Sequence, residues 1–428
     1  MLLFFEEGVI VSVKIDTALE KEGWNMTAKT DLEGFRTDVS DWVQANFPSS
    51  LKGFDLMSES PASKGLGADF KTWQKKLGDK GWGTPTWPKE YGGAGLSDPE
   101  AKIIRQEIAK AGAFNPISPM TGMGVTMVGP TILEYGTDEQ KAKHLPGIAS
   151  GEVRWCLGLS EPNAGSDLAS LATKAVDEGD AFVLNGQKIW TSGAHISHWC
   201  GAVVRTDPKA KKRDGISFVM LPMDQPGVET RPIKLIAGSS PFCETFFNDA
   251  RAEKSDLLGD LNDGWSVVKR LLQHERQSQT SSPGVPKADE EPLQEQAKRY
   301  VGTAEDGTLA DPDLRLRLVQ NLMDAEAHKL TVSRITAEAR GKVNVSAAAS
   351  ILKNSMTRVA QTKAELTLEM MGNQGVGWEG NQFSDDELQS VRDWLFGKAM
   401  SIYGGSAEIQ NNIISKNILG LPETTQQG

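Results

Sequence analysis

Cysteine is scarce in this chain. Its 428 residues include only three cysteines, Cys156, Cys200 and Cys243, which are widely spaced and odd in number. This set argues against a disulfide framework and against a thiolate metal cage, and it favours a reducing cytoplasm. The five histidines show no metal-ligand spacing. We therefore expect a cytoplasmic protein without a metal site.

Excess positive charge and long apolar runs are also missing. The formal net charge is −11 at pH 7, and such a surface repels phosphate backbones, so no nucleic-acid partner is expected. No stretch of about 20 apolar residues occurs, so no membrane span is expected. The first apolar run is broken by Glu6 and Glu7 and lacks a basic flank. We interpret residues 1–26 as an N-terminal extension rather than a signal peptide.

The length exceeds what one core usually holds, so several domains are expected. Residues 27–150 are typical of an α-helical domain. The isoleucines of "DPEAKIIRQEIAKAG" recur at helical spacing, and "TDEQ" is a capping-box pattern at a helix start. The Gly- and Pro-rich "GWGTPTWPKEYGGAGLS" predicts a loop.

The period of the apolar residues changes to two over residues 151–258. Short runs of β-formers alternate with turn signals such as Asn185-Gly186, which predicts a small antiparallel β-barrel or sandwich. Helical patterns return over residues 259–428, interrupted at 277–296 by a Pro-, Ser- and acid-rich segment that we interpret as a mobile insertion. The predicted fold class is α+β with three domains, and cofactors often bind at such domain junctions.

Two polar segments could carry chemistry. "WCLGLSEPNAGSDLASLATKA" runs from a strand into a loop that can present backbone N–H groups and hydroxyls to a phosphate or a flavin edge. "NGQKIWTSGAHISHW" places Trp190 and Ser192 on one face of a strand, where an indole can cover a planar ring. Taken alone, the first segment also fits a polar β-turn, and Trp190 also fits a core position.

Together, "LSEPNAGSD" and "NGQKIWTSG" closely resemble the paired signatures of the acyl-CoA dehydrogenase family. Four further stretches fit the family in the same order: "TWPKEYGGAG", "FFNDARAEKSDLLGDLNDGW", "EMMGNQGVGWEG" and "YGGSAEIQNNIISKNILGLP". The resemblance covers about residues 35 to 422. It implies a helical domain, a middle β domain and a C-terminal helical bundle, with FAD as the cofactor.

The resemblance also implies which residues contact FAD. Ser160 would lie near the pyrimidine end of the flavin, and Ser192 would reach N(5). Glu369 and Asn373 belong to a turn that holds the dinucleotide of a neighbouring subunit. The implied cofactor contacts are Leu157, Leu159, Ser160, Ser166, Trp190, Thr191, Ser192, Glu369, Asn373, Ser406 and Glu408.

Two departures from the family pattern stand out. The family's Arg-x-x-Phe-Gly motif should follow the helix at 265–276, and the insertion stands there instead, which leaves the grip on the pyrophosphate open. In the best-known members a catalytic glutamate follows the tyrosine of the C-terminal turn. Here that position is Gly404.

A carboxylate near the substrate's α-carbon is still required, because hydride loss from the β-carbon accompanies loss of the α-proton. In "DGWSVVKRLLQHER", Glu275 continues the apolar face of Val268, Leu271 and Leu272 at helical spacing. By pattern alone, a buried pair with an arginine is an equal interpretation. The isovaleryl and long-chain members carry their base on this helix before an arginine, and Glu275 resembles that base.

The sequence therefore predicts an FAD-dependent acyl-CoA dehydrogenase of lipid catabolism that passes electrons to an electron-transferring flavoprotein. We expect a homodimer or homotetramer. Two alternatives stay open: a flavin-binding partner subunit of a heterotetramer, and an oxygen-using oxidase or monooxygenase on the same fold. The acyl group cannot be deduced. The expected substrate contacts are Ser166, Gln273, Arg276, Gly404 and Gly405.

Overall fold

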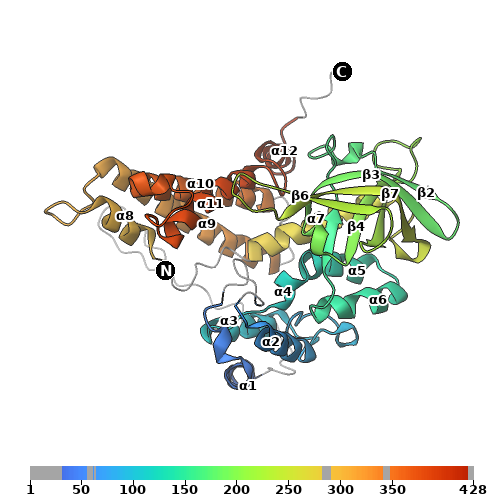
Figure 1. Ribbon diagram of the computed structural model, residues 1–428, viewed down its shortest axis with the longest axis horizontal. Helices are drawn as coiled ribbons and strands as arrows, with labels where there is room; N and C mark the ends of the chain where they lie inside the picture. Colours follow the sequence, from blue (N-terminus) through green and yellow to red (C-terminus); the bar gives the residue numbers. More distant parts are fainter. Residues whose placement is uncertain (1–30, 55–60, 62–63, 282–290, 341–347, 423–428) are drawn as a thin grey trace, which may run out of the picture.

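The computed structural model describes residues 31–54, 61, 64–281, 291–340 and 348–422. Along the chain, a helical domain, a β domain and a second helical domain follow one another (Figure 1). The predicted three-part α+β organisation is confirmed. The expected extension at 1–26 lies outside the described residues.

The first domain consists of helices whose starts carry strong local signals. The predicted capping box is confirmed: Thr137 and Gln140 exchange hydrogen bonds at the start of α6. A second box, formed by Ser97 and Glu100, opens α3. The elements are α1 (Leu32–Asn46), η2 (Ser49–Leu51), α2 (Gly67–Asp79), η3 (Lys89–Tyr91), α3 (Asp98–Lys110), α4 (Ile117–Met120), the π-helix η4 (Gly124–Val128), α5 (Gly129–Tyr135) and α6 (Asp138–Ala149).

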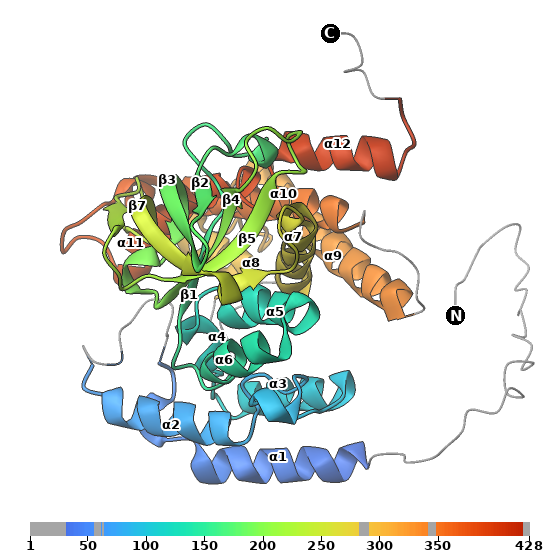
Figure 2. The same cartoon turned by 90° about the vertical axis from the view of Figure 1, so that its right-hand side faces the viewer.

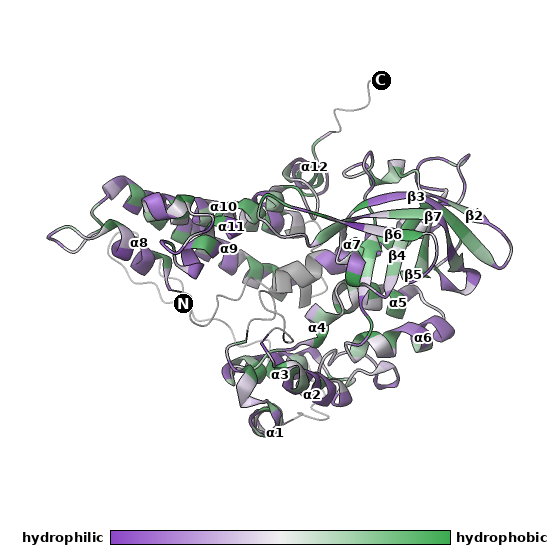
Figure 3. Ribbon diagram, in the orientation of Figure 1, coloured by the Kyte–Doolittle hydropathy of each residue, from purple (hydrophilic) through white to green (hydrophobic). Residues whose placement is uncertain are grey.

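The middle domain is one eight-stranded sheet with the order β6-β7-β3-β2-β4-β5-β8, and β1 pairs with β4. The sheet is mixed rather than antiparallel throughout, because β1 and β4 run parallel. The strands are β1 (Trp155–Gly158), β2 (Lys174–Asp177), β3 (Ala181–Ser192), β4 (Trp199–Arg205), β5 (Ile216–Pro222), β6 (Val228–Ile233), β7 (Phe242–Glu253) and β8 (Leu257–Leu258). Figure 3 shows long hydrophobic stretches on these strands.

The turn predicted at Asn185-Gly186 is wrong. Both residues lie inside β3, at a β-bulge where the pairing with β7 shifts. The Asn185 side-chain amide donates to the Asp249 carboxylate across the strands at 2.9 Å. The extra residue of the bulge is Asp249 of β7, which has a φ of 58°, and Asn185-Gly186 stays paired on the opposite strand. The dipeptide signal alone does not show whether the chain turns or continues as a strand.

The C-terminal domain is helical, and helices occupy both ends of the segment predicted as an insertion. Helix α7 (Gly264–Ser281) continues past residue 277, and α8 (Leu293–Val301) begins before 296. Residues 282–290 lie outside the described part. The remaining elements are α9 (Pro312–Arg340), α10 (Ala348–Met371), η8 (Gly372–Val376), α11 (Asp385–Gly397), η9 (Lys398–Ser401) and α12 (Ala407–Asn417).

Helix α7 lies where the three domains meet (Figure 2). Its Val268 and Leu271 are fully buried in a cluster that also holds Ile132 of α5 and Phe218 of β5. One apolar cluster thus joins α7 to the first helical domain and to the sheet. The position of α7 is set by burial on two sides rather than by local propensity.

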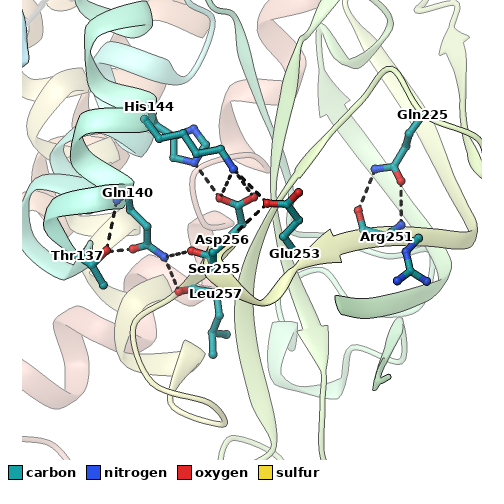
Figure 4. Close-up of polar contacts among 10 residues, drawn as sticks. Thr137, Gln140, His144, Gln225, Arg251, Glu253, Ser255, Asp256 and Leu257 are labelled. Carbon is teal, nitrogen blue, oxygen red and sulfur yellow. Dashed lines mark hydrogen bonds and ion pairs between the residues drawn. The ribbon is translucent and has the colours of Figure 1, made fainter. Parts of the chain in front are cut away.

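A polar cluster ties α6 to the segment between β7 and β8 (Figure 4). The buried Asp256 carboxylate accepts hydrogen bonds from His144 Nε2 at 3.1 Å and from Lys143 Nζ at 2.8 Å. Gln140 donates to the carbonyl oxygens of Ser255 and Leu257 at 2.7 and 2.8 Å. Burial alone would raise the pKa of Asp256, but the bonds from His144 and Lys143 outweigh burial and lower it.

Replacing Asp256 with Ala should therefore destabilise the protein by about 3 kcal/mol, near the lower end for a broken buried pair, because Lys143 can reach water. Since the folded-state pKa is lowered, this contribution is present above the unfolded pKa of about 4 and is lost as the pH falls through the folded value. Denaturant unfolding of wild type and variant from pH 7 to 3 measures it. The exposed Asp260→Ala is the control. Equal unfolding midpoints for the wild type and D256A at pH 7 would contradict the prediction.

Candidate active site

The polar loop after β1 is attached to β3 by a buried lysine. Lys188 is fully buried, and its Nζ donates to the Glu161 carboxylate at 2.8 Å and to the Leu159 carbonyl oxygen at 3.0 Å. The backbone N–H of Ile189 donates to the carbonyl oxygen of Ser160 at 2.9 Å. The loop and the strand that precedes Trp190 are thus held as one unit.

Glu161 completes this unit. Its two carboxylate oxygens accept backbone N–H bonds from Ala172 at 2.7 Å and Thr173 at 2.9 Å, so the far end of the loop is also fastened. Burial would raise the pKa of Glu161, but Lys188 and the backbone donors lower it overall. Burial lowers the pKa of Lys188, and the charge of Glu161 opposes that shift. Each group supplies the other's counter-charge, which offsets part of the cost of burying both.

Trp190 stands on a bulge of β3. The pairing with β7 shifts between Lys188 and Thr191, and Trp190 has a positive φ of 61°. The bulge turns its indole outward, so that the residue is 53% exposed while Thr191 is fully buried. Ser192 is half-buried. Trp190 and Ser192 thus lie on the opposite side of the strand from Thr191, as the alternation predicts.

Aromatic rings continue from Trp190 toward the C-terminal helices. Phe242 of β7 meets Trp190 edge-on at 6.2 Å, and Phe396 of α11 lies parallel to Phe242 at 6.3 Å. The buried hydroxyl of Thr191 has no hydrogen-bond partner within the described chain. An exposed indole backed by ordered rings offers a planar ligand a stacking surface at this domain junction.

The end of α7 presents Glu275. Val268 and Leu271 are buried as predicted, whereas Leu272 and Glu275 are half-buried, and the neighbouring His274 is the residue that continues the buried face. The spacing therefore identifies the face correctly and misjudges which residue lies deepest on it.

Two charged contacts anchor α7 below this point. Arg270 donates two hydrogen bonds of 2.6 Å to the Glu134 carboxylate of α5, which lowers the pKa of Glu134. Arg270 also donates to the Gln273 side-chain oxygen at 2.9 Å. His274 Nε2 lies 3.4 Å from Glu134. The side-chain oxygen of Gln273, a predicted substrate contact, thus already accepts a hydrogen bond within the protein.

Glu275 approaches the C-terminal turn. Burial and the negative charge of Glu275 raise the pKa of Tyr403, so the carboxylate acts electrostatically on that phenol. Burial lowers the pKa of Lys353 on α10, and the charges of Glu275 and Glu408 oppose this. Lys353 is only 6% exposed and donates to the Met400 carbonyl oxygen at 2.6 Å. Glu275 and the turn that follows Met400 are therefore neighbours from distant parts of the chain.

Two glycines shape this turn. Gly404 and Gly405 have φ values of 64° and 88°, in the region that glycine adopts without strain. The Gln410 side chain donates to the Gly404 carbonyl oxygen at 2.8 Å, and Ser406 caps α12 by accepting from the N–H of Ile409. Gly404 supplies no carboxylate, so Glu275 is the half-buried acid beside the turn.

The other predicted residues lie further apart. Ser166 is exposed near the tip of the loop, and Glu408 is exposed on the first turn of α12. Glu369 is paired with Arg317, and Asn373 is exposed on η8. Glu369 follows Lys353 by 16 residues on α10, or roughly 24 Å at 1.5 Å per residue. The site at Glu275 and the turn of Glu369 and Asn373 are thus well separated within one chain.

The remaining predicted contact residues differ in how deeply they are buried. Leu157 is buried in β1, and Leu159 and Ser160 are half-buried beside Lys188. Arg276 lies on α7, and its side chain is outside the described part. Sequence reasoning missed Glu161, Lys188 and Lys353. A lysine amid the β-formers of "NGQKIW" and an acid in the loop before it are the only sequence signals for the first two.

Family models match all three parts of the chain: the acyl-CoA dehydrogenase N-terminal domain over 31–152, the middle domain over 156–250 and the C-terminal domain over 262–419. The chain belongs to the acyl-CoA dehydrogenase family. This is an oxidoreductase family, and the resemblance seen in the sequence is confirmed.

Named relatives agree. The chain is 37% identical to acyl-CoA dehydrogenase IpdE1 of Mycolicibacterium smegmatis, over 92% of this chain and 98% of the relative. The solved structure described as Tcur3481-Tcur3483 steroid ACAD has a TM-score of 0.72 at 30% identity and covers 92% of this chain and 98% of its own. The ChsE4-ChsE5 complex of Mycobacterium tuberculosis has a TM-score of 0.69 at 28% identity, over 93% of this chain and 100% of that chain.

Among the described residues, no helix is long and apolar enough to cross a membrane. Within the same ranges, no group of three or more histidine, cysteine, aspartate or glutamate side chains could hold a metal ion.

Replacing Lys188 with Met should detach the loop from β3. It leaves Glu161 buried without its counter-charge, and we expect a loss of about 3–5 kcal/mol in the free energy of unfolding. The double variant K188M/E161Q removes both charges and should recover most of that stability. Chemical denaturation measures both. Lys174→Met, an exposed lysine on β2, is the control. A single variant as stable as K174M would contradict the role of Lys188.

Proposed function

We propose that this chain is an FAD-dependent acyl-CoA dehydrogenase that converts an acyl-CoA thioester to the trans-2-enoyl-CoA. The observation that carries the proposal is the approach of Glu275 to the Tyr403–Gly405 turn. Glu275 comes from α7, and Tyr403–Gly405 form the turn between η9 and α12. Their meeting supplies the carboxylate that the glycine at position 404 does not.

FAD is the proposed cofactor, and the residues present fit a flavin. The exposed Trp190 indole and the half-buried Ser192 offer a ring face and a hydroxyl side by side on one bulged strand. The loop of Leu159 and Ser160, fastened to the same strand through Lys188, lies adjacent in the sheet. FAD, when bound there, supplies the acceptor for the substrate hydride.

Glu275 would take the α-proton. Glu275 is half-buried, and a carboxylate within reach of the α-carbon is the group that general-base catalysis requires. The backbone N–H groups at Gly404 and Gly405 would donate to the thioester carbonyl oxygen and stabilise the enolate-like charge that develops there. Lys353 holds the turn through Met400 and contributes a positive charge near Glu275. Arg276 would help to orient the thioester.

The acyl group is proposed to be bulky and alicyclic. The support is the similarity at 30% identity to a structure described as a steroid ACAD. A screen with an artificial electron acceptor over straight, branched, alicyclic and steroid acyl-CoA thioesters tests this. Turnover confined to straight-chain thioesters would contradict it.

The electron acceptor is proposed to be an electron-transferring flavoprotein, and the assembly a homo-oligomer or a heterotetramer. Two structural neighbours named above carry paired chain names, and the Arg-x-x-Phe-Gly motif is absent here. Both points keep the heterotetramer as a candidate. Expression of the chain alone decides: yellow, active protein supports the homo-oligomer, and colourless protein that becomes active with a partner chain supports the heterotetramer.

Trp190→Ala should lower FAD retention and shift the flavin absorption spectrum, because the ring face that covers the flavin is lost. The fold should remain, since the indole is largely exposed. Flavin content after gel filtration and the visible spectrum measure the effect. Val176→Ala, equally exposed at 53% on the same sheet, is the matched control. If W190A keeps its flavin and its spectrum, Trp190 has no part in cofactor binding.

Glu275→Gln keeps the shape of the side chain but cannot accept the proton. We expect the rate of flavin reduction by substrate to fall by about 10²–10⁴-fold, the usual range for loss of a general base. FAD content should not change. Stopped-flow reduction measures the rate, and Gly404→Glu in the same background should restore part of it. Glu408→Gln is the comparison, and a larger loss in E408Q than in E275Q would assign the base to α12 instead.

A further inference from the structure

The first helical domain contains a cavity of about 460 Å³ that has no place in the proposed reaction. Residues 82–87, one face of α3 and the connection from α3 to α4 form its walls, and Val125 of the π-helix η4 closes one side. Its volume lies within the range of roughly 300–1,000 Å³ that is usual for small-molecule sites. None of the residues assigned above to flavin, thioester or proton transfer lines it.

The π-helix η4 forms the wall between this cavity and α7. Val125 lines the cavity, whereas Met127 and Val128 of the same element are buried in the cluster that holds Val268 and Leu271 of α7. A π-helix is rare and frequently accompanies a functional site. The cavity is therefore a neighbour of the proposed active site and not part of it.

The lining has three chemical zones. Most of it is apolar and aromatic, and Trp82, Trp87 and Phe114 are its largest side chains. Thr84 is 3% exposed, and its hydroxyl has no hydrogen-bond partner in the described chain. Arg105 lines the cavity from the exposed side of α3, and no ion pair joins it to the described residues.

Asn115 does not add to the polar groups available to a ligand. Its amide nitrogen donates to the Gly83 carbonyl oxygen at 3.2 Å, and its oxygen accepts from the N–H of Ile117 at 3.0 Å. The lining also holds the hydroxyls of the exposed Thr86 and the half-buried Ser118. The polar groups available to a ligand are thus three hydroxyls, of which only that of Thr84 is buried, and one exposed cation. The Thr84 hydroxyl is itself covered, so a ligand oxygen would reach it after rotation about χ1.

We propose that this cavity is a binding site for an amphipathic carboxylic acid with a rigid alicyclic or aromatic body. The apolar body would lie against the two tryptophans. A hydroxyl or carbonyl oxygen of the ligand would pair with Thr84, because a buried hydroxyl without a partner is costly. The carboxylate would face Arg105 at the solvent side, where a planar guanidinium binds carboxylates well. This site is independent of the proposed acyl-CoA reaction.

Isothermal titration of the full-length purified protein with monomeric deoxycholate, and with its uncharged methyl ester, tests the proposal. We expect saturable binding of one acid per chain. Arg105→Gln should weaken the acid by about 2–5-fold and leave the ester unchanged, as for a solvent-exposed ion pair. Thr84→Val should weaken both by about 5-fold, the effect of one hydrogen bond. Ala113→Phe, at a half-buried position of the lining, should abolish binding by filling the cavity.

Lys102→Gln is the matched control, because Lys102 is an exposed cation on the same helix that does not line the cavity. Melting curves check that each variant folds. If T84V does not fold, R105Q still tests the proposal, because Arg105 is exposed and its replacement should not disturb the fold. Absence of saturable binding overturns the proposal. Binding that A113F leaves intact also overturns it. Displacement of the acid by an acyl-CoA overturns it too, because that result would assign the acid to the active site.

Discussion

The ammonium group of Lys188, buried between a strand and a loop, is the interaction on which the cofactor side of this molecule depends. Burial of a charge costs several kcal/mol unless a counter-charge and hydrogen bonds compensate for it. Glu161 supplies the counter-charge, and the Leu159 carbonyl oxygen supplies a further acceptor. Lys188 reaches both the Glu161 carboxylate and the Leu159 carbonyl oxygen only when the loop lies against the strand. The position of the polar loop relative to Trp190 is therefore fixed.

Helix α7 fixes the position of the proposed proton acceptor, Glu275, as Lys188 fixes the position of the loop. Its apolar face is buried against both neighbouring domains, and Arg270 fixes its rotation through Glu134 of α5. With the helix held on two sides, Glu275 is directed to the turn that Lys353 holds from α10. The candidate site therefore exists only where three domains meet, and loosening any one of them would misplace the carboxylate.

The C-terminal helices also separate two sets of predicted contacts. Lys353 and Glu369 lie on the same helix, roughly 24 Å apart by its rise per residue. A ligand held at Trp190 and Glu275 would have to be long to reach Glu369 as well. The distance agrees with a role for Glu369 and Asn373 toward a second subunit, and it gives the proposed oligomer a function beyond stability.

The sequence by itself determined the order of helical, β and helical domains, the capping box at Thr137 and the family, because these follow from local periodicity and contiguous motifs. It also placed Glu275 on a core-facing side of its helix. Only the tertiary structure decided that Asn185-Gly186 lies within a strand, opposite a bulge at Asp249, and not in a turn. It also decided that Lys188 and Lys353 are buried with partners. Those outcomes depend on contacts between residues far apart in the chain, such as Lys353 with Met400 or Asn185 with Asp249, and no pattern along the sequence encodes which distant group will compensate a buried charge.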